Sequence, residues 1–219
     1  LGAKLTLPKL HTVSYLYFET SPSDSRAAYK NDGGKGGNVK PNTNTKYSFP
    51  SLKQVRRFVA ADNVELNFPE LKRATSFDLA GTKYISTPKL EKVDNLSVVD
   101  THLESASLTT VDILEVTNAT IDLPKLSGNL TTLRINASEV ILPNIENVNH
   151  ISVSRGTLSL PDTLVIGSYV HISKGGALTI PEVDLISGDV ELQSGSSIYA
   201  NKLVNIGGNL IIGSSQYKN

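Results

Sequence analysis

Polar and aromatic residues in the second half of the chain recur at intervals of about one repeat of 19 positions. They form two series, which contain Arg134, His150, Tyr169, His171, Asp189 and Glu191. Together they offer hydrogen bonds, charge and an aromatic ring, which are the properties needed to recognise a polar ligand. We expect them to form one surface patch. The sequence leaves two interpretations open, a ligand-binding site and a solvated face.

A second group that could bind a ligand lies near the start of the chain. Tyr15 and Tyr17 alternate within one segment, and Arg57 takes the place of Tyr15 in the next repeat. Exposed aromatic rings and arginine are enriched at recognition sites. We therefore treat these three residues as a further candidate site.

The sequence does not favour metal or catalytic chemistry. Cysteine is absent, which excludes disulfides, a cysteine nucleophile and thiolate metal ligands. His150 and His171 fall in different series, whereas a metal site needs a tighter set of histidines and carboxylates. No GxSxG or paired-carboxylate motif stands out, and the charged residues are too scattered for a polysaccharide lyase on a parallel β-helix. We expect no enzymatic activity, no metal and no cofactor.

A proline-containing tetrapeptide sets the spacing of all these residues. It reads apolar-Pro-x-Leu or a close variant, and eight of the ten prolines belong to it. Its copies begin at positions 7, 49, 68, 87, 123, 142, 160 and 180, so most gaps are 18 to 20 residues. The gap of 36 residues is two repeats with Ala106 in place of proline, and the gap of 42 is one repeat plus an insertion. A period near 19 over the whole chain predicts a solenoid, in which each coil packs on its neighbours.

Within each repeat, apolar and polar residues alternate over three to five positions, which is typical of half-buried strands. No segment has the periodicity of an amphipathic helix. We predict an all-β, right-handed solenoid, leucine-rich-repeat-like or parallel β-helix-like, with about ten coils of 18–20 residues and little helix. Prolines should lie at corners and aliphatic side chains inside. Outward residues should form columns with neighbours about 4.8 Å apart.

One domain is expected over residues 1–219, with a polar insertion at 21–47 between the first and second coils. The insertion is rich in Gly, Asn, Ser and Lys, and it lacks the GxxxxGK[ST] frame of a phosphate-binding loop. Long loops are either functional or simply mobile. Both interpretations remain open.

Charge and hydropathy limit the partners. Lys plus Arg and Asp plus Glu number 21 each, so the net charge is zero. A binder of nucleic acid or another polyanion normally shows a basic excess or stripe, so we expect no nucleic-acid partner. No apolar stretch reaches the 18 residues that a membrane-spanning helix needs. The chain lacks methionine and opens in mid-repeat at Leu1, which indicates a mature or trimmed segment.

The repeat frame LPxL-xx-V-xx-LxV resembles a leucine-rich repeat, although it is short and lacks the consistent asparagine after the LxV triplet. The segments LISGDVEL at 185–192 and LVNIGGNLII at 203–212 resemble the receptor L-domain and the surface leucine-rich repeats of Bacteroidetes lipoproteins. The resemblance implies an extracellular, non-enzymatic adhesin. It further implies a lipid anchor in the outer membrane through a removed N-terminal segment.

The combined expectation is a cell-surface module that binds a glycan or protein ligand through the outward face of the solenoid. Two alternatives stay open. One is a structural spacer that presents another domain at a distance. The other is a fungal wall glycoprotein of similar repeat type, in which four Asn-x-Ser/Thr sequons would carry glycans. The sequence does not indicate an oligomeric state.

Overall fold

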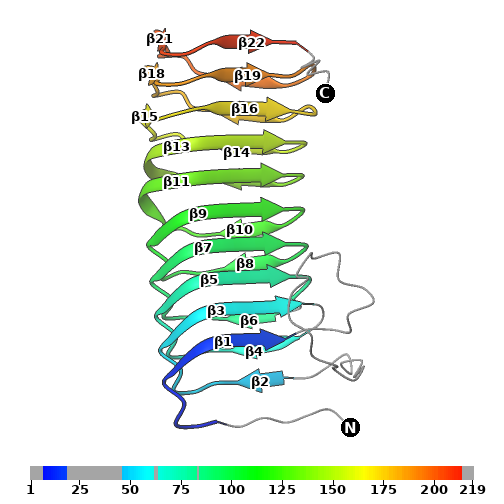
Figure 1. Cartoon of the computed structure of the whole chain (residues 1–219), viewed down its shortest axis with the longest axis vertical. Coiled ribbons are helices and arrows are strands. Elements are labelled where there is room, and N and C mark those ends of the chain that lie inside the picture. Colours follow the sequence, from blue (N-terminus) through cyan, green and yellow to red (C-terminus); the bar gives the residue numbers. More distant parts are fainter. Residues whose placement is uncertain (1–6, 19–45, 62–63, 83, 214–219) are drawn as a thin grey trace.

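The computed structural model describes residues 7–18, 46–61, 64–82 and 84–213, and every regular element in these residues is a β-strand. The strands stack in parallel into a rod of coils (Figure 1). The strands of the largest sheet run from left to right across the front of Figure 1 while the chain rises, so the coil is right-handed. The predicted all-β solenoid is confirmed.

The largest sheet contributes one level per coil. Its first seven strands are β1 (Thr12–Phe18), β3 (Gln54–Ala61), β5 (Arg73–Ala80), β7 (Lys92–Val99), β9 (Thr110–Thr117), β11 (Ser127–Asn136) and β13 (Asn144–Ser154). The next levels are split into β15 (Val165–Ile166) with β16 (Val170–Ser173), β18 (Leu185–Ile186) with β19 (Val190–Leu192), and β21 (Asn205–Ile206) with β22 (Leu210–Ile212). The path from β1 to β21 has ten levels and so makes about nine turns, close to the ten coils predicted.

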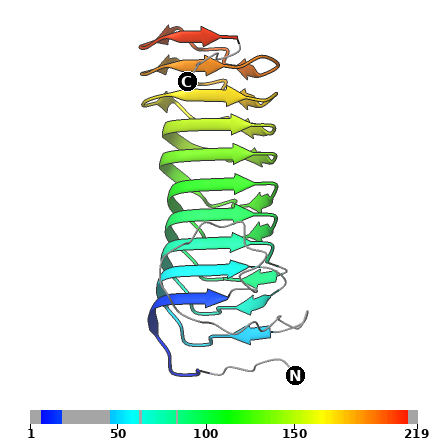
Figure 2. The same cartoon turned by 45° about the vertical axis from the view of Figure 1, so that its right-hand side comes forward.

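Three-residue strands form the opposite side of the coil, behind the long sheet in Figure 2. One sheet contains β2 (Lys46–Ser48), β4 (Glu65–Asn67) and β6 (Tyr84–Ser86). The others contain β8 (His102–Glu104) with β10 (Thr120–Asp122), and β12 (Glu139–Ile141), β14 (Thr157–Ser159), β17 (Ala177–Thr179) and β20 (Ser197–Tyr199). All of these pairs are parallel. From residue 49 onward, each proline tetrapeptide forms the corner that leads from a short strand toward the next long strand.

Stacked ladders of apolar side chains fill the interior. The last residue of the tetrapeptide gives a fully buried column that contains Leu52, Leu71, Leu90 and Leu108. Burying one such side chain contributes about 1.5–3 kcal/mol relative to leaving it in water. No single coil encloses its own core, so this burial exists only because the neighbouring coils stack.

The core of the N-terminal coils contains aromatic as well as aliphatic side chains, whereas the sequence predicted aliphatic ladders throughout. All five phenylalanines of the chain lie there, and they are Phe18, Phe49, Phe58, Phe68 and Phe77. The rings of Phe58 and Phe77 stack with centroids 4.6 Å apart, and those of Phe49 and Phe68 with centroids 5.2 Å apart. From Leu79 onward the buried ladders contain no aromatic side chain among the described residues.

The corner after the long strand uses left-handed backbone at non-glycine residues. The φ angles lie between 45° and 56° at Asp100, Asn118, Ala137, Arg155 and Lys174. This conformation costs about 1–2 kcal/mol in an L-residue. The corner amides offset part of that cost at the first four of these residues, because each of the four donates to a carbonyl of the next coil, as Asn118 does to Asn136 at 2.9 Å.

The predicted insertion at 21–47 falls outside the described residues except for its last two. Lys46 and Tyr47 already belong to β2, and the Tyr47 ring lies 4.8 Å from that of Phe18. The repeat therefore resumes two residues earlier than predicted. No helix that could span a membrane occurs in the part of the chain that the structure describes.

Candidate binding site

The register of the long sheet confirms the two columns that the residue spacing predicts. Ser152, His171 and Glu191 are direct partners on successive coils. The backbone amide after His150 donates to the Tyr169 carbonyl, and the amide after Tyr169 donates to the Asp189 carbonyl. His150, Tyr169 and Asp189 therefore form the adjacent column, on the same three coils as Ser152, His171 and Glu191. The predicted residues are therefore neighbours on one face.

The long strand is interrupted on this face, and the surface is not flat at the interruption. In β13 two residues, Asn149 and His150, separate the positions that pair with β15 and β16. On the next coil three residues, 167–169, separate β15 from β16, so one extra residue interrupts the strand. The following coil repeats the break at 187–189, where Gly188 lies so close to the Ser168 carbonyl that a Cβ would overlap it.

A shallow hollow of about 560 Å³ lies at the break, and we call it the C-terminal hollow. Its lining comes from four successive coils and comprises Ser152, Ser168, Tyr169, Val170, His171, Gly188, Asp189, Glu191 and Ile211. It contains four of the predicted residues, and one of them, Tyr169, is 39% exposed. The hollow thus combines an aromatic ring, an imidazole and two carboxylates.

Polar contacts within the C-terminal hollow fix part of its lining. His171 Nδ1 donates to Glu191 Oε2 at 3.1 Å, and both side chains are about a quarter exposed. Asp189 Oδ1 accepts bonds from the backbone amide of Asn209 at 2.7 Å and from its side-chain amide at 3.1 Å. These bonds orient the two carboxylates while leaving acceptor sites open, since each carboxylate can accept about four hydrogen bonds.

His150 and Arg134 do not line the hollow. The His150 ring meets the Tyr169 ring edge to face with centroids 5.0 Å apart, and its Nδ1 lies 3.2 Å from the Thr131 carbonyl. His150 therefore supports the tyrosine. Arg134 forms an ion pair with Glu115 on the preceding coil. Arg134 belongs to the same face, but its charge is already partnered.

The second predicted group also comes together. Tyr15 and Tyr17 have parallel rings with centroids 6.2 Å apart, and they are 53% and 46% exposed. Arg57 is the register partner of Tyr15, and its Nε lies 3.7 Å from Asp78 Oδ2. Burial raises the pKa of the Asp78 carboxyl, although a hydrogen bond from Ser76 and the nearby Arg57 act in the opposite direction. Neither tyrosine lines the C-terminal hollow.

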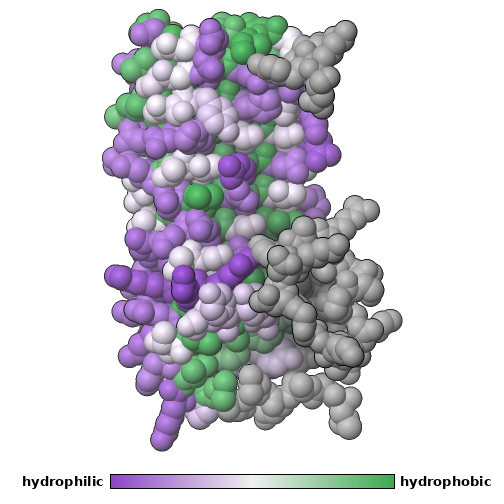
Figure 3. Space-filling model, in the orientation of Figure 1, coloured by the Kyte–Doolittle hydropathy of each residue, from purple (hydrophilic) through white to green (hydrophobic). Residues whose placement is uncertain are grey.

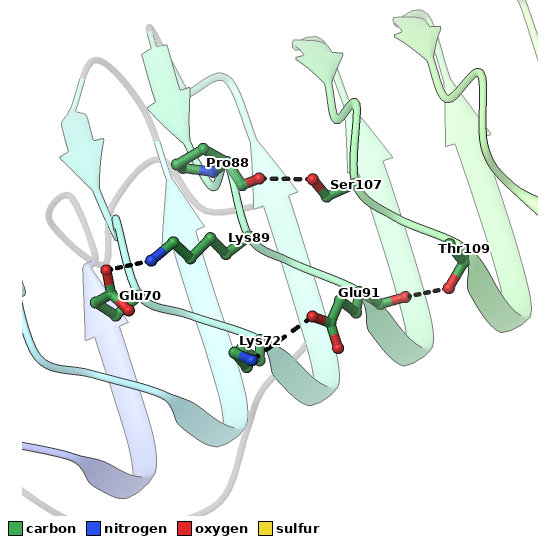
Figure 4. A network of polar contacts seen from close by, with 7 residues as sticks. All are labelled: Glu70, Lys72, Pro88, Lys89, Glu91, Ser107 and Thr109. Carbon is green, nitrogen blue, oxygen red and sulfur yellow. Dashed lines mark hydrogen bonds and ion pairs between the residues drawn. The ribbon is translucent and has the colours of Figure 1, made fainter.

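Sequence reasoning missed a group of charged residues at the corner before the long sheet. Figure 4 shows part of this corner, where Lys89 pairs with Glu70 at 2.6 Å and Lys72 lies 3.8 Å from Glu91. The overall balance of 21 cationic and 21 anionic residues conceals it. The available signal was the recurrence of lysine at positions 53 and 72, one repeat apart.

Within the described ranges, no three His, Asp or Glu side chains come together in a way that could hold a metal ion. Comparisons with protein families, with curated proteins and with solved structures find no match to this chain. The resemblance to leucine-rich-repeat surface proteins therefore stays a prediction.

Proposed function

We propose that the chain is a non-enzymatic binding module of a cell surface, and that it recognises a glycan or protein ligand through the C-terminal hollow. The observation that carries the proposal is the assembly of Tyr169, His171, Asp189 and Glu191 at one strand break. A half-exposed ring offers an apolar surface, and carboxylates accept hydrogen bonds from hydroxyl or amide groups. Because the hollow contains two carboxylates and no lysine or arginine, it suits a neutral or cationic ligand.

The fold also suits this role. The outward columns do not contribute to the apolar ladders, so their residues can differ from coil to coil without loss of the core. The straight stack of coils in Figures 1 and 2 favours a second candidate function, a spacer that holds another domain away from the surface. A spacer needs no ligand.

A double variant tests the binding role. The chain is screened against arrays of glycans and of matrix proteins, and any binder is then titrated against Tyr169→Ala/His171→Ala. The variant should fold, since surface substitutions usually change stability within about 0.5 kcal/mol. Loss of an aromatic anchor should weaken binding by at least about 1 kcal/mol, or about fivefold.

The matched control is Asn95→Ala/Ser97→Ala, which changes the same two columns on β7. It should leave affinity unchanged. Equal affinity of the Tyr169→Ala/His171→Ala variant and the unmodified chain would move the site to Tyr15 and Tyr17. Absence of any reproducible binder would favour the spacer.

A further inference from the structure

Cationic side chains from successive coils meet at the corner that leads into β3, β5 and β7. They line two hollows, one of about 680 Å³ at the corner and one of about 340 Å³ over the first residues of the strands. Seven lysine and arginine side chains line the two hollows together with three carboxylates, which leaves a net charge of +4. We call this surface the basic strip, and its exposed cations on β3, β5, β7 and the corners before them are Lys53, Arg56, Lys72, Arg73, Lys89 and Lys92.

Half of these cations form no ion pair within 4 Å in the part of the chain that the structure describes, although Lys53 is near enough to Glu70 to help lower the pKa of that carboxyl. Lys72, Lys89 and Lys92 each lie within 4 Å of a carboxylate, at 3.8, 2.6 and 3.5 Å. No ion pair joins Lys53, Arg56 or Arg73 to any described residue. The three unpaired charges come from two neighbouring coils, so they reinforce one another over a short length of the rod.

The repeat places two of these charges, those of Arg73 and Lys92, in one row along the rod. Gln54, Arg73 and Lys92 are register partners on three successive strands. Neighbouring strands lie about 4.8 Å apart, which is close to the length of one sugar unit in an extended polysaccharide. Figure 3 shows hydrophilic residues along the left side of the lower half, where these strands begin. A linear polyanion with one charge per sugar would match this spacing.

The rest of the lining favours a saccharide over a nucleic acid. No aromatic side chain lines either hollow, whereas single-stranded nucleic acids stack their bases on such rings. The phosphates of one DNA strand are about 3.4 Å apart along the axis, which does not match the coil spacing. Ser107 and Thr109 donate to the carbonyls of Pro88 and Glu91 (Figure 4), so their lone pairs remain available to sugar hydroxyls.

We propose that the basic strip binds an acidic polysaccharide, carboxylated or sulfated, laid along the axis of the rod. This site is separate from the C-terminal hollow, and it does not depend on the function proposed for that hollow. It also corrects the expectation, drawn from zero net charge, that no basic stripe exists. The net charge of the chain is nevertheless zero, partly because acidic residues predominate in the C-terminal coils. The described residues from 181 to 213 contain four carboxylates and one lysine.

The test measures binding of the full chain to heparin, polygalacturonate and neutral dextran at low and high salt, with a DNA oligonucleotide as competitor. Heparin represents the sulfated class and polygalacturonate the carboxylated class. The key variant, Lys53→Gln/Arg56→Gln/Arg73→Gln, removes the unpaired charges. A matched control, Arg155→Gln/Lys174→Gln/Lys202→Gln, removes three charges from exposed positions in the C-terminal half.

We expect at least one acidic polysaccharide to bind, dextran not to bind, and salt to weaken the complex. The key variant should bind about tenfold more weakly, and the control variant should stay within about twofold of the unmodified chain. Tyr169→Ala/His171→Ala should leave this binding unchanged, which separates it from the C-terminal hollow. The proposal is overturned by no binding of either acidic polysaccharide at low salt, by equal losses in the two triple variants, or by tighter binding of DNA.

Discussion

Two buried threonines with opposite hydrogen-bonding states allow a sharp test of how polar groups act inside this solenoid. Thr163 is fully buried, and its hydroxyl donates to the Ile145 carbonyl at 2.7 Å. Thr87 is 3% exposed, and its hydroxyl has no hydrogen-bond partner among the described residues. Replacing each with valine keeps the β-branched shape and exchanges only the hydroxyl for a methyl group. The two variants should therefore change stability in opposite directions.

The expected magnitudes follow from the two environments. In Thr163→Val the chain loses one net hydrogen bond, about 1 kcal/mol, and more if the Ile145 carbonyl is left without a partner. In Thr87→Val the chain loses a buried hydroxyl whose desolvation costs about 1–3 kcal/mol and is not offset by any hydrogen bond. We expect the free energy of unfolding to fall by about 1 kcal/mol in the first variant and to rise by about 1 kcal/mol in the second.

Urea denaturation followed by circular dichroism would compare the two midpoints and the slopes of the transitions. Repeat arrays can unfold in more than one step, so hydrogen exchange of amides on neighbouring coils should accompany it. Equal losses in both variants would refute the reasoning. They would mean that Thr87 has a partner in solution, or that valine does not fit the site.

Three further predictions follow from the backbone and the charges. Ala137→Gly should raise the free energy of unfolding by about 1 kcal/mol, because φ is 49° at Ala137 and glycine adopts this conformation without strain. Ala60→Gly, in the regular strand β3, should lower the free energy of unfolding by about 1 kcal/mol. Chemical denaturation of the two variants measures both changes. Gly188→Ala should lower the free energy of unfolding by about 1–3 kcal/mol, because a Cβ would overlap the Ser168 carbonyl, and a smaller loss would show that the break can relax. Burial raises the pKa of Asp78 above the ordinary 3.8, so the folded state favours its neutral form and stability should fall as pH rises through the raised value. Asp78→Asn should remove that decline in urea midpoints measured between about pH 3 and pH 7, and an unchanged profile would assign the decline to another group.

The fold could be predicted because one residue type, proline, marks most of the coils, with Ala106 in its place in one of them. The tetrapeptide prolines fixed the repeat length, and alternation on either side of them fixed which residues point inward. These two constraints set the register, so the columns of His171 and Tyr169 followed from counting alone. Handedness followed from the general behaviour of parallel crossovers.

The strand break and the C-terminal hollow could not be predicted in the same way. The spacing of 20 residues between Pro161 and Pro181 showed that this coil is longer, but it did not show that the extra residue breaks the strand or that a hollow lies beside Tyr169. The basic strip was missed for a different reason. Lys53 and Arg73 are 20 residues apart in a chain without net charge, and only stacking brings them onto adjacent coils.

Coil length separates the two candidate surfaces. The repeats that begin at Pro50 and Pro69 are 19 residues long, and their strands β3 and β5 are continuous, so side chains stay in straight columns. Straight columns present like groups at a constant spacing, which suits a ligand that is itself a repeating chain. The repeat that begins at Pro161 is 20 residues long, and its strand is interrupted between β15 and β16. An interrupted strand forms a local recess, which suits a single group such as one sugar or one side chain. One additional residue per coil therefore changes the kind of ligand that the same scaffold can accept, without any change in its buried ladders.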